Sequence, residues 1–229
     1  MKHGRRTGAP PHEHFLMSIS TVMSRIGVYY RRNGWWATAC RAALGVKRTL
    51  FSNHMVIHYC DLSEQRSRPS ELPSSVKIER KRAKAELSTQ ELEQIVDCWN
   101  SRIARRNIAE RFGHGASLWT ITSEGGLAGY GWTLSGGTVE PHYLLLGQHD
   151  VHLFDFYVFP QYRGKGMNPL LVTYILGNLA AEAAGRAFIE AAEWNRQQLA
   201  SLARTPFRRL GRARKLTVLG HTIVCWAKN

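Results

Sequence analysis

Residues 158–169, Val-Phe-Pro-Gln-Tyr-Arg-Gly-Lys-Gly-Met-Asn-Pro, combine glycine and basic side chains in a pattern that suits the binding of a phosphate group. The apolar run over residues 152–159 predicts a strand buried on both faces, which Pro160 ends. Apolar residues at helical spacing follow up to residue 184, with Pro169 in the expected first turn. The glycine-containing segment is therefore expected at a helix N-terminus, where unpaired N–H groups and the helix dipole attract anions.

Gly164 and Gly166 allow a ligand to approach the backbone closely, while Arg163 and Lys165 add positive charge. These features together predict a site for a pyrophosphate. Two other phosphate motifs do not fit, because the chain has neither the Gly-Lys-Ser/Thr ending of a P-loop nor the three spaced glycines of a dinucleotide fingerprint.

The order Gln161-x-x-Gly164-x-Gly166 resembles the central motif of the GNAT-type N-acetyltransferase superfamily. The resemblance extends over roughly residues 76–227 and implies an α/β (α+β) GNAT fold, in which helices flank a mixed, mostly antiparallel central sheet. It implies that the loop binds the pyrophosphate of acetyl-CoA and that the preceding strand hydrogen-bonds to the pantetheine arm. The cofactor-binding residues implied in this way are Phe156, Tyr157, Val158, Arg163, Gly164, Lys165, Gly166, Met167, Asn168 and Asn195.

Three positions depart from the pattern of the family. Asn168 stands where a small Gly or Ala is common, and Pro206 replaces the Gly before the aromatic Phe207. Leu202 occupies the position at which many members carry a Tyr that protonates the departing CoA thiolate. The role of that Tyr therefore cannot be carried over to this chain.

Transfer of an acetyl group to an amine needs a neutral amine, and a carboxylate near the thioester can serve as the base. Asp155 and Glu190 are the two candidates by position. Asp155 interrupts an apolar strand, and because an unpaired buried carboxylate costs several kcal/mol, it should have either a partner or a catalytic purpose. Four further residues between the strands line the acceptor site or occupy surface loops: His142, Tyr143, His149 and His152.

The candidate site residues must be positioned by helices and strands, which the rest of the sequence predicts. Ser88 and Glu91 form a capping box that opens a helix, and Gly125-Gly126 suits a tight turn between two strands. The expected strands cover residues 76–79, 118–123, 127–134, 152–159, 187–192, a stretch near 207, and 217–227; the expected helices cover residues 88–99, 102–112, 169–184 and a stretch from 196.

The N-terminal part divides into a disordered tail over residues 1–13, a helical extension over 14–64 and a linker over 65–75, followed by the acetyltransferase domain over 76–229. The apolar stripe of the extension either docks on the domain as an additional helical layer or lies in a membrane interface. No secretory signal and no stretch of eighteen apolar residues is recognised.

Length and composition fit one main globular domain, since the chain has 229 residues and 44% hydrophobic content. The four cysteines form no Cys-x-x-Cys pair, so a reducing cytoplasm is expected, with neither a disulfide framework nor a zinc site. His12 with His14, and His54 with His58, have spacings that a metal could use, but a polar tail and the start of a strand are the favoured interpretations, and no metal is expected.

The net charge of +14 predicts a polyanionic partner, which includes CoA, anionic lipid, acidic glycan and nucleic acid. Near the end of the chain, a basic cluster either contacts CoA or an acidic acceptor or forms a solvated face: Arg204, Arg208, Arg209, Arg212, Arg214 and Lys215.

The sequence thus predicts a cytoplasmic N-acetyltransferase that transfers acetyl from acetyl-CoA to a primary amine of a small or sugar-linked acceptor. Peripheral contact with the inner face of the membrane is an added option. Two alternatives remain: a CoA-binding protein of the same fold without turnover, and a basic nucleic-acid-binding protein, for which no binding motif is present.

Overall fold

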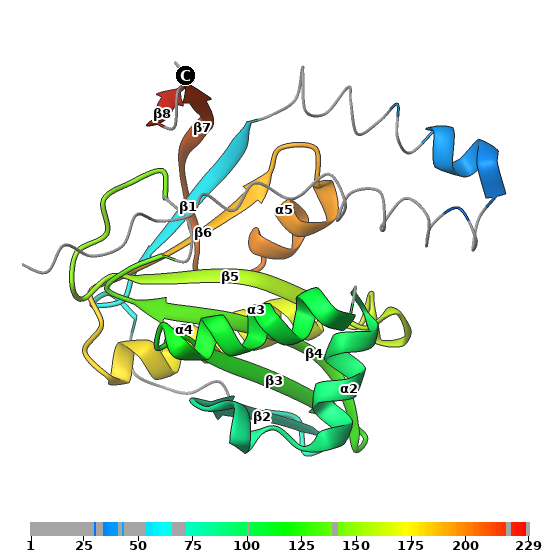
Figure 1. The fold of residues 1–229 in the computed structure, drawn as a ribbon. Helices are drawn as coiled ribbons and strands as arrows, with labels where there is room; N and C mark the ends of the chain where they lie inside the picture. Colours follow the sequence, from blue (N-terminus) through cyan, green and yellow to red (C-terminus); the bar gives the residue numbers. More distant parts are fainter. Residues whose placement is uncertain are drawn as a thin grey trace, which may run out of the picture.

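The computed structural model describes residues 30, 34–40, 43, 54–65, 72–99, 101–138, 142–218 and 221–227. Eight strands in these residues form one sheet in the order β2-β3-β4-β5-β6-β1-β7-β8 (Figure 1). The strands are β1 Met55–Asp61, β2 Val76–Lys81, β3 Ser117–Ser123, β4 Gly126–Ser135, β5 Val151–Val158, β6 Arg186–Ala192, β7 Arg208–Val218 and β8 His221–Trp226. Among these strands only β5 and β6 pair in parallel, which confirms the predicted mixed, mostly antiparallel sheet.

The described helices are α2 Thr89–Asp97, α3 Ser101–Gly113, α4 Met167–Ala181 and α5 Arg196–Leu202, with short 3-10 turns η1 Lys84–Glu86 and η2 Pro160–Tyr162. In Figure 1, α3 crosses in front of the sheet and α4 lies behind it. The sheet is therefore covered on both faces, and β3 and most of β4 are buried along their length.

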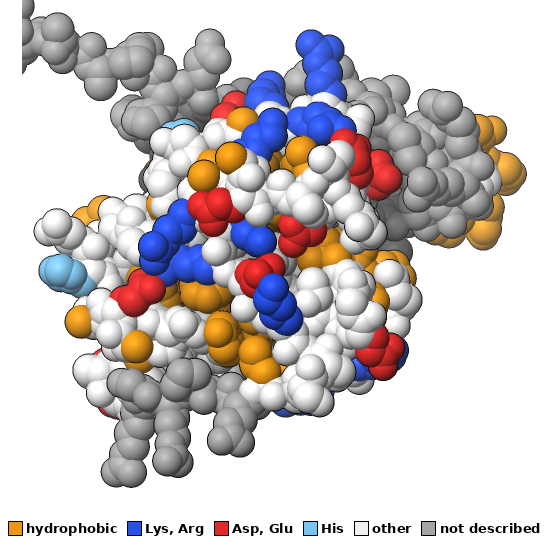
Figure 2. All heavy atoms as spheres, turned by 90° about the horizontal axis from the view of Figure 1, so that it is seen from below, with side chains coloured by type: hydrophobic (Ala, Val, Ile, Leu, Met, Phe, Trp, Pro, Cys, Tyr) orange, Lys and Arg blue, Asp and Glu red, His pale blue; other side chains and the backbone are white. Residues whose placement is uncertain are grey.

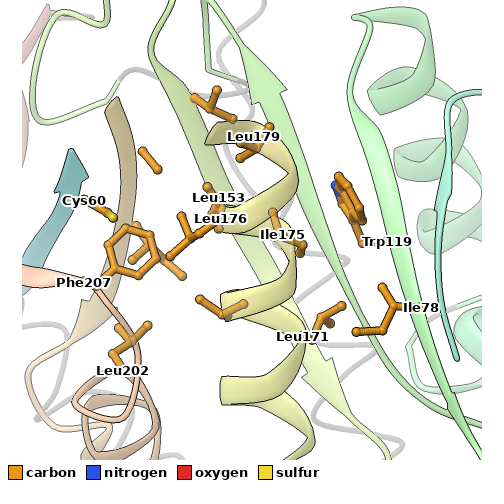
Figure 3. Packing of buried hydrophobic residues seen from close by; sticks show 14 of the residues in the cluster. Cys60, Ile78, Trp119, Leu153, Leu171, Ile175, Leu176, Leu179, Leu202 and Phe207 are labelled. Carbon is orange, nitrogen blue, oxygen red and sulfur yellow. The ribbon is translucent and has the colours of Figure 1, made fainter. Parts of the chain in front are cut away.

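Two hydrophobic clusters hold these layers together, one on each face of the sheet. Behind it, α4 buries residues such as Leu171 and Ile175 against Trp119 and Leu153 (Figure 3). In front, Ile108 of α3 belongs to the second cluster, which includes Leu118, Tyr130 and Trp132 of β3 and β4. Neighbours such as Leu118 and Trp119 enter opposite clusters because successive strand residues point to opposite faces.

Local signals in the sequence set the first helix as expected and the first hairpin with its turn one residue earlier than the expected Gly125-Gly126. Glu91 donates its backbone N–H to Ser88 Oγ at 3.2 Å, and Ser88 returns its N–H to the Glu91 carboxylate at 2.9 Å, which completes the capping box. The hairpin turn uses Glu124 and Gly125, whose φ angles of 52° and 77° are those of a primed turn, and Gly126 already begins β4.

The expected N-terminal boundary of the domain is wrong. Residues 14–64 were expected to be a helical extension, but Met55–Asp61 form strand β1, which lies between β6 and β7 inside the sheet. Val56 and Ile57 are strand-forming residues buried in the core, and their partners occur far later in the chain. His54 accordingly lies directly before a strand, and His58 lies in the middle of it. Residues 34–40 are helical, whereas the expectations for 1–29 and 66–71 fall outside the described residues.

The C-terminal part also differs from the expectation. The segment 217–227, expected as one strand, contains the end of β7 and the whole of β8, while most of the basic cluster lies in β7. None of the helices in the described part of the chain is long and apolar enough to span a membrane.

The face seen from below, toward the β2 edge, carries Lys and Arg next to Asp and Glu around a group of hydrophobic side chains (Figure 2). Ion pairs at this edge include Lys77–Glu79 and Arg80–Glu182, both at 2.7 Å. The positive net charge of the chain is therefore partly neutralised on this face and does not form a uniform basic surface there.

Candidate active site

Strands β5 and β6 pair over three positions only, and this short pairing creates the central feature of the site. Val151, His152 and Leu153 lie opposite Ala187, Phe188 and Ile189, after which the pairing ends although β5 continues to Val158 and β6 to Ala192. Figure 1 shows the two strands diverging. We call this divergence the β5–β6 fork. Backbone groups of β5 beyond Leu153 have no strand partner on the β6 side, so they can pair with an extended ligand.

A clamp closes the opposite end of the two strands. The Arg186 guanidinium donates to both carboxylate oxygens of Asp150, at 3.0 and 2.8 Å, and the Gly147 N–H donates to the same carboxylate at 2.8 Å. Burial alone would raise the pKa of Asp150, but these hydrogen bonds outweigh it and lower the pKa. The strands are thus held at their beginnings and separate toward their ends.

A β-bulge in β5 marks the mouth of the fork. Tyr130 pairs with Tyr157 and Trp132 with Phe154, so that Asp155 and Phe156 together face the single residue Gly131. Asp155 adopts a φ of 51°, unusual for a residue other than glycine. The bulge breaks the alternation along β5, and the predicted burial on both faces holds only for the first three residues of the strand.

Asp155 has the partner that its position called for. Its carboxylate lies 2.6 Å from Arg111 Nη1 of α3, and the guanidinium of Arg111 covers the rings of Trp132 and Phe154 at 5.1 and 5.3 Å. The carboxylate is one-third exposed, so the expectation of a buried acid is wrong. The bulge turns the side chain out of the core, toward α3, and the ion pair ties α3 to the fork.

The predicted phosphate loop has the expected geometry. Gly164 and Gly166 both have φ angles near 78°, and Gly166 is the N-cap of α4. The first helical hydrogen bond runs from the Leu170 N–H to the Gly166 carbonyl at 3.2 Å, so the N–H groups of Met167 and Asn168 precede it and lack an intrahelical acceptor. Pro169, the next residue, has no N–H. The loop presents backbone donors at the positive end of a fifteen-residue helix.

The basic side chains of the loop lie over aromatic rings. Arg163 donates to the Val158 carbonyl at 3.1 Å with its guanidinium 5.6 Å from the Tyr157 ring, and the Lys165 ammonium lies 5.5 Å from the ring of Tyr162. Phe156 packs on the opposite side of the sheet, against the α4 cluster and over Gly131, where a Cβ would lie 2.3 Å from the ring. The contacts with the Val158 carbonyl and the two tyrosine rings thus hold the Arg163 and Lys165 side chains at the loop.

Arg204 is a further cation at this loop. Its guanidinium lies 3.4 Å from the position that a Cβ would take on Gly166. Two other members of the basic cluster form ion pairs elsewhere: Arg208 pairs with Glu64 and Arg212 with Glu193, both at 2.8 Å. The basic cluster was expected either to contact CoA or an acidic acceptor or to form a solvated face. Arg204 lies near the phosphate loop, as the first expectation requires.

Two predicted cofactor residues make structural contacts near the loop. Asn168 donates from Nδ2 to Ser201 Oγ at 2.8 Å and joins α4 to α5. Asn195 caps α5 by accepting the Gln198 N–H at 3.2 Å, and its own Nδ2 donates to Gln198 Oε1 at 3.1 Å. Leu202, at the position of the family's Tyr, is buried in the α4 cluster. An aliphatic, buried side chain at this position cannot donate a proton to the CoA thiolate.

At the start of the fork, two histidines share one carboxylate. His152 Nε2 of β5 lies 2.9 Å from Glu190 Oε2 of β6, and His142 Nε2, from the connection between β4 and β5, lies 3.3 Å from the same oxygen. We call these three residues the His–Glu cluster. The sequence predicts these three residues only as separate candidates. The signal that joins two of them is that His152 and Glu190 lie on adjacent parallel strands, one step before and one step after the last paired position.

The electrostatics of the His–Glu cluster favour an ionised carboxylate. Burial alone would raise the pKa of Glu190, but the hydrogen bonds from His142 and His152 outweigh it and lower the pKa to about 2. His142 and His152 are themselves nearly inaccessible, with side chains 2% and 7% exposed. The other two histidine-loop candidates lie outside the cluster, since His149 is exposed and Tyr143 lies beneath the Lys215 ammonium at 4.4 Å.

The neighbours of the two rings indicate their tautomers. If both Nε2 atoms carry hydrogen and donate to Glu190, both Nδ1 atoms hold lone pairs. This fits His142, whose Nδ1 receives the Leu144 N–H at 3.4 Å, while His152 Nδ1 is buried without a partner among the described residues. His152 therefore has one buried ring nitrogen without a partner, while its other ring nitrogen contacts a carboxylate, an arrangement that general bases use.

The same three side chains also have ligand atoms within 4.8 Å of one another, a spacing that a divalent metal could use. A metal-bound imidazole normally donates its other N–H to an acceptor. In the described structure His142 Nδ1 faces an N–H and His152 Nδ1 faces no partner, so neither ring has that acceptor. The surroundings of the cluster fit proton transfer better than metal binding.

A pocket of about 150 Å³ lies beside the fork, on the face covered by α2 and α3. Six of its nine lining residues are apolar, and Asn107, Arg111 and Asp155 supply polar groups. The lining residues are Ile95, Trp99, Ile103, Ala104, Asn107, Ile108, Arg111, Trp132 and Asp155.

Residues 82–204, more than half of the chain, match the model of the acetyltransferase (GNAT) family, and the chain belongs to this family. The family transfers acyl groups and generally uses acetyl-CoA as the donor. A comparison with curated proteins gives no match.

Two solved structures support the fold. A tandem GNAT protein from the clavulanic acid biosynthesis pathway is 15% identical with a TM-score of 0.52, over 75% of this chain and 56% of that chain. A GNAT-family acetyltransferase from Colwellia psychrerythraea is 12% identical with a TM-score of 0.50, over 76% of this chain and 55% of that chain. The protein thus spans just over half the length of these structures, and at such identities the likeness shows the fold alone.

Proposed function

We propose that this protein is an N-acetyltransferase that moves an acetyl group from acetyl-CoA to the primary amine of a small acceptor. The observation that carries the proposal is the β5–β6 fork, which has a phosphate loop near the end of β5 and the His–Glu cluster at its closed end. A donor with a phosphate at one end and a reactive thioester at the other can lie along β5 between these two sites.

In this proposal the cofactor contacts follow the order of the chain. The pyrophosphate binds the N–H groups of the loop from Gly164 to Asn168, with Arg163, Lys165 and Arg204 supplying charge. The pantetheine arm pairs with the backbone of Phe156, Tyr157 and Val158 as an added strand. The five residue steps from Val158 back to Leu153 span roughly 17 Å at the rise of a strand, so an extended arm brings the thioester to the fork.

The His–Glu cluster supplies the proton transfers. The amine nitrogen attacks the thioester carbon, the C–S bond breaks, and the proton that the amine loses passes to His152 Nδ1 while Glu190 stabilises the imidazolium. Because Leu202 cannot act as an acid, the same imidazolium returns this proton to the CoA sulfur. Acetyl amide and CoA thiol are the products, and the cluster ends in its starting state.

Glu190 serves better than Asp155 in this scheme. Asp155 is held by Arg111 at 2.6 Å and faces the pocket, whereas Glu190 backs a histidine with a free nitrogen at the start of the fork. We assign Asp155 a positioning role, in which it fixes Arg111 and the bulge. The first alternative, a CoA-binding protein without turnover, has the same loop but would not need the cluster.

Kinetics with acetyl-CoA and a panel of primary amines test the proposal through the release of CoA thiol. We expect His152→Gln and Glu190→Gln to lower kcat by about 10²- to 10⁴-fold, the usual contribution of general base catalysis. Both variants should keep the wild-type Kd for acetyl-CoA in calorimetry. His149→Gln changes an exposed histidine outside the cluster and is the matched control.

The outcomes separate the alternatives. Binding of acetyl-CoA without thiol release for any amine would identify a non-catalytic CoA-binding protein. Equal affinity of wild type and Gly166→Glu for acetyl-CoA would contradict the phosphate loop. Binding of nucleic acid that weakens steeply with salt, in the absence of acetyl-CoA binding, would favour the third option.

A further inference from the structure

We propose that the pocket between α2, α3 and β5 holds a ring-sized apolar group of the acceptor, so that the acceptor is a primary amine carried two or three carbons from an aromatic ring. This inference rests on the proposed acetyl transfer and specifies its acceptor. The pocket has about the volume of a cavity that takes up benzene in an engineered protein core, about 150 Å³.

The walls of the pocket favour an aromatic guest. Trp99, just after α2, and Trp132 of β4 supply ring faces, while Ile95, Ala104 and Ile108 supply aliphatic surface. Aromatic groups gain both area burial and ring-to-ring contact on such walls. The lining offers few polar partners, because Asp155 is already paired with Arg111 and only Asn107 Oδ1 lacks a partner among the described residues, so several hydroxyl groups or a second ammonium would remain largely unpaired at a cost in free energy. A sugar amine or a polyamine therefore fits this pocket poorly.

The pocket and the His–Glu cluster lie on the same face of the sheet, and one side chain separates them. Phe154 stacks on His152 with ring centroids 5.1 Å apart, and its ring also stacks on that of Trp132 in the pocket wall, with centroids 6.4 Å apart. A ring beside Trp132 consequently lies about one aromatic side chain away from the histidine. A linker of two or three carbons between the ring and the amine of the acceptor spans the distance from the pocket to His152.

One polar atom of the pocket adds a finer preference. Asn107 Oδ1 is buried and has no hydrogen-bond partner among the described residues, although Asn107 lines the pocket. An unsatisfied buried acceptor is costly, and a guest that donates a hydrogen bond removes the cost. A ring bearing a hydroxyl or ring N–H donor should therefore bind more tightly than an unsubstituted ring.

The experiment compares kcat/KM of the full chain for tyramine, phenethylamine, ethylamine, putrescine and glucosamine. We expect tyramine to exceed ethylamine, putrescine and glucosamine by at least tenfold and to exceed phenethylamine by about fivefold. Ala104→Phe fills the pocket and should lower the ratio of kcat/KM for tyramine to that for ethylamine at least tenfold. Ala109→Phe, at an exposed position of the same helix outside the pocket lining, should leave this ratio unchanged.

Asn107→Leu removes the buried acceptor and should abolish the preference for tyramine over phenethylamine, and it provides a second test if Ala104→Phe fails to fold. A wild-type preference for glucosamine or putrescine over tyramine would overturn the inference while leaving the acetyl transfer intact. Absence of thiol release with every amine would instead contradict the proposed function. An unchanged ratio in a folded Ala104→Phe variant would also overturn the assignment of the pocket.

Discussion

His152 Nε2 lies 2.9 Å from Glu190 Oε2, and the two residues belong to strands that separate immediately beyond them. The contact therefore joins the two halves of the sheet at the point where they part. Because the carboxylate is held ionised by the histidines, the cluster links the stability of the fork to its state of protonation.

Replacement of Glu190 by Gln should change how the stability of the protein depends on pH. The folded state lowers the pKa of Glu190 from 4.5 to about 2, so the ionised form contributes stability that is fully present above pH 4.5 and is lost as the pH falls toward 2. Wild type should lose up to about 3 kcal/mol more than Glu190→Gln over this window. Urea unfolding at pH 5, 4 and 3 measures the difference, and parallel losses in both proteins would contradict it.

Arg204→Ala should weaken acetyl-CoA binding about tenfold, because a hydrogen bond to a charged group contributes about 1.5 kcal/mol. The guanidinium lies beside Gly166 at the phosphate loop. Arg214→Ala, at an exposed position of β7, removes the same charge and controls for the net electrostatic attraction. Calorimetry at 50 and 500 mM salt should show the effect of Arg204→Ala shrinking as salt rises, and equal effects of the two variants would sink the assignment.

Asp150→Asn should destabilise the protein by about 2 kcal/mol, since it breaks a pair whose acid is buried while its Arg186 partner is half exposed. Glu64→Gln breaks the exposed pair with Arg208 and should cost much less, because exposed ion pairs contribute little to stability. Chemical denaturation at pH 7 measures both values. Similar small losses would mean that the clamp does not hold β5 and β6 together.

Gly129→Ala should lower stability by about 2 kcal/mol or more, because a Cβ at this position of β4 would lie 2.6 Å from the Tyr157 carbonyl oxygen of β5. The two nearest atoms both belong to the β5 backbone, which cannot move aside as a flexible side chain could. Gly113→Ala, at the end of α3, meets no atom within 4 Å and is the matched control. Thermal unfolding of the two variants tests the prediction, and a normal melting temperature for Gly129→Ala would refute the close approach of the strands.

Features governed by neighbouring residues could be predicted from the sequence. The Ser88 capping box, the glycine loop ending at Gly166 and the helix after it depend on local hydrogen bonds and backbone conformation, which short segments express directly. The resemblance carried by the loop then supplied the arrangement of the sheet. Asp155 stood out in the sequence because a carboxylate in an apolar strand needs an explanation, and the bulge together with the ion pair to Arg111 provides a structural one.

Features that depend on distant pairing were missed. The strand-forming residues of β1 give no sign that their partners are β6 and β7, and a short apolar run does not distinguish a strand from part of a helix. The His–Glu cluster needs the parallel register of β5 and β6 together with the path of the connection that carries His142. Neither property is expressed in the local sequence.

The position of β1 has a consequence for the order in which the protein folds. Strands β2 to β5 form a half-sheet from one continuous stretch of chain, whereas β1 reaches its neighbours β6 and β7 across nearly the whole intervening sequence. Closing so large a loop costs entropy before any contact compensates for it. During synthesis, the half that carries β4 and β5 can therefore form first, and the β5–β6 fork exists only after β6, whose other neighbour is β1, has joined the sheet.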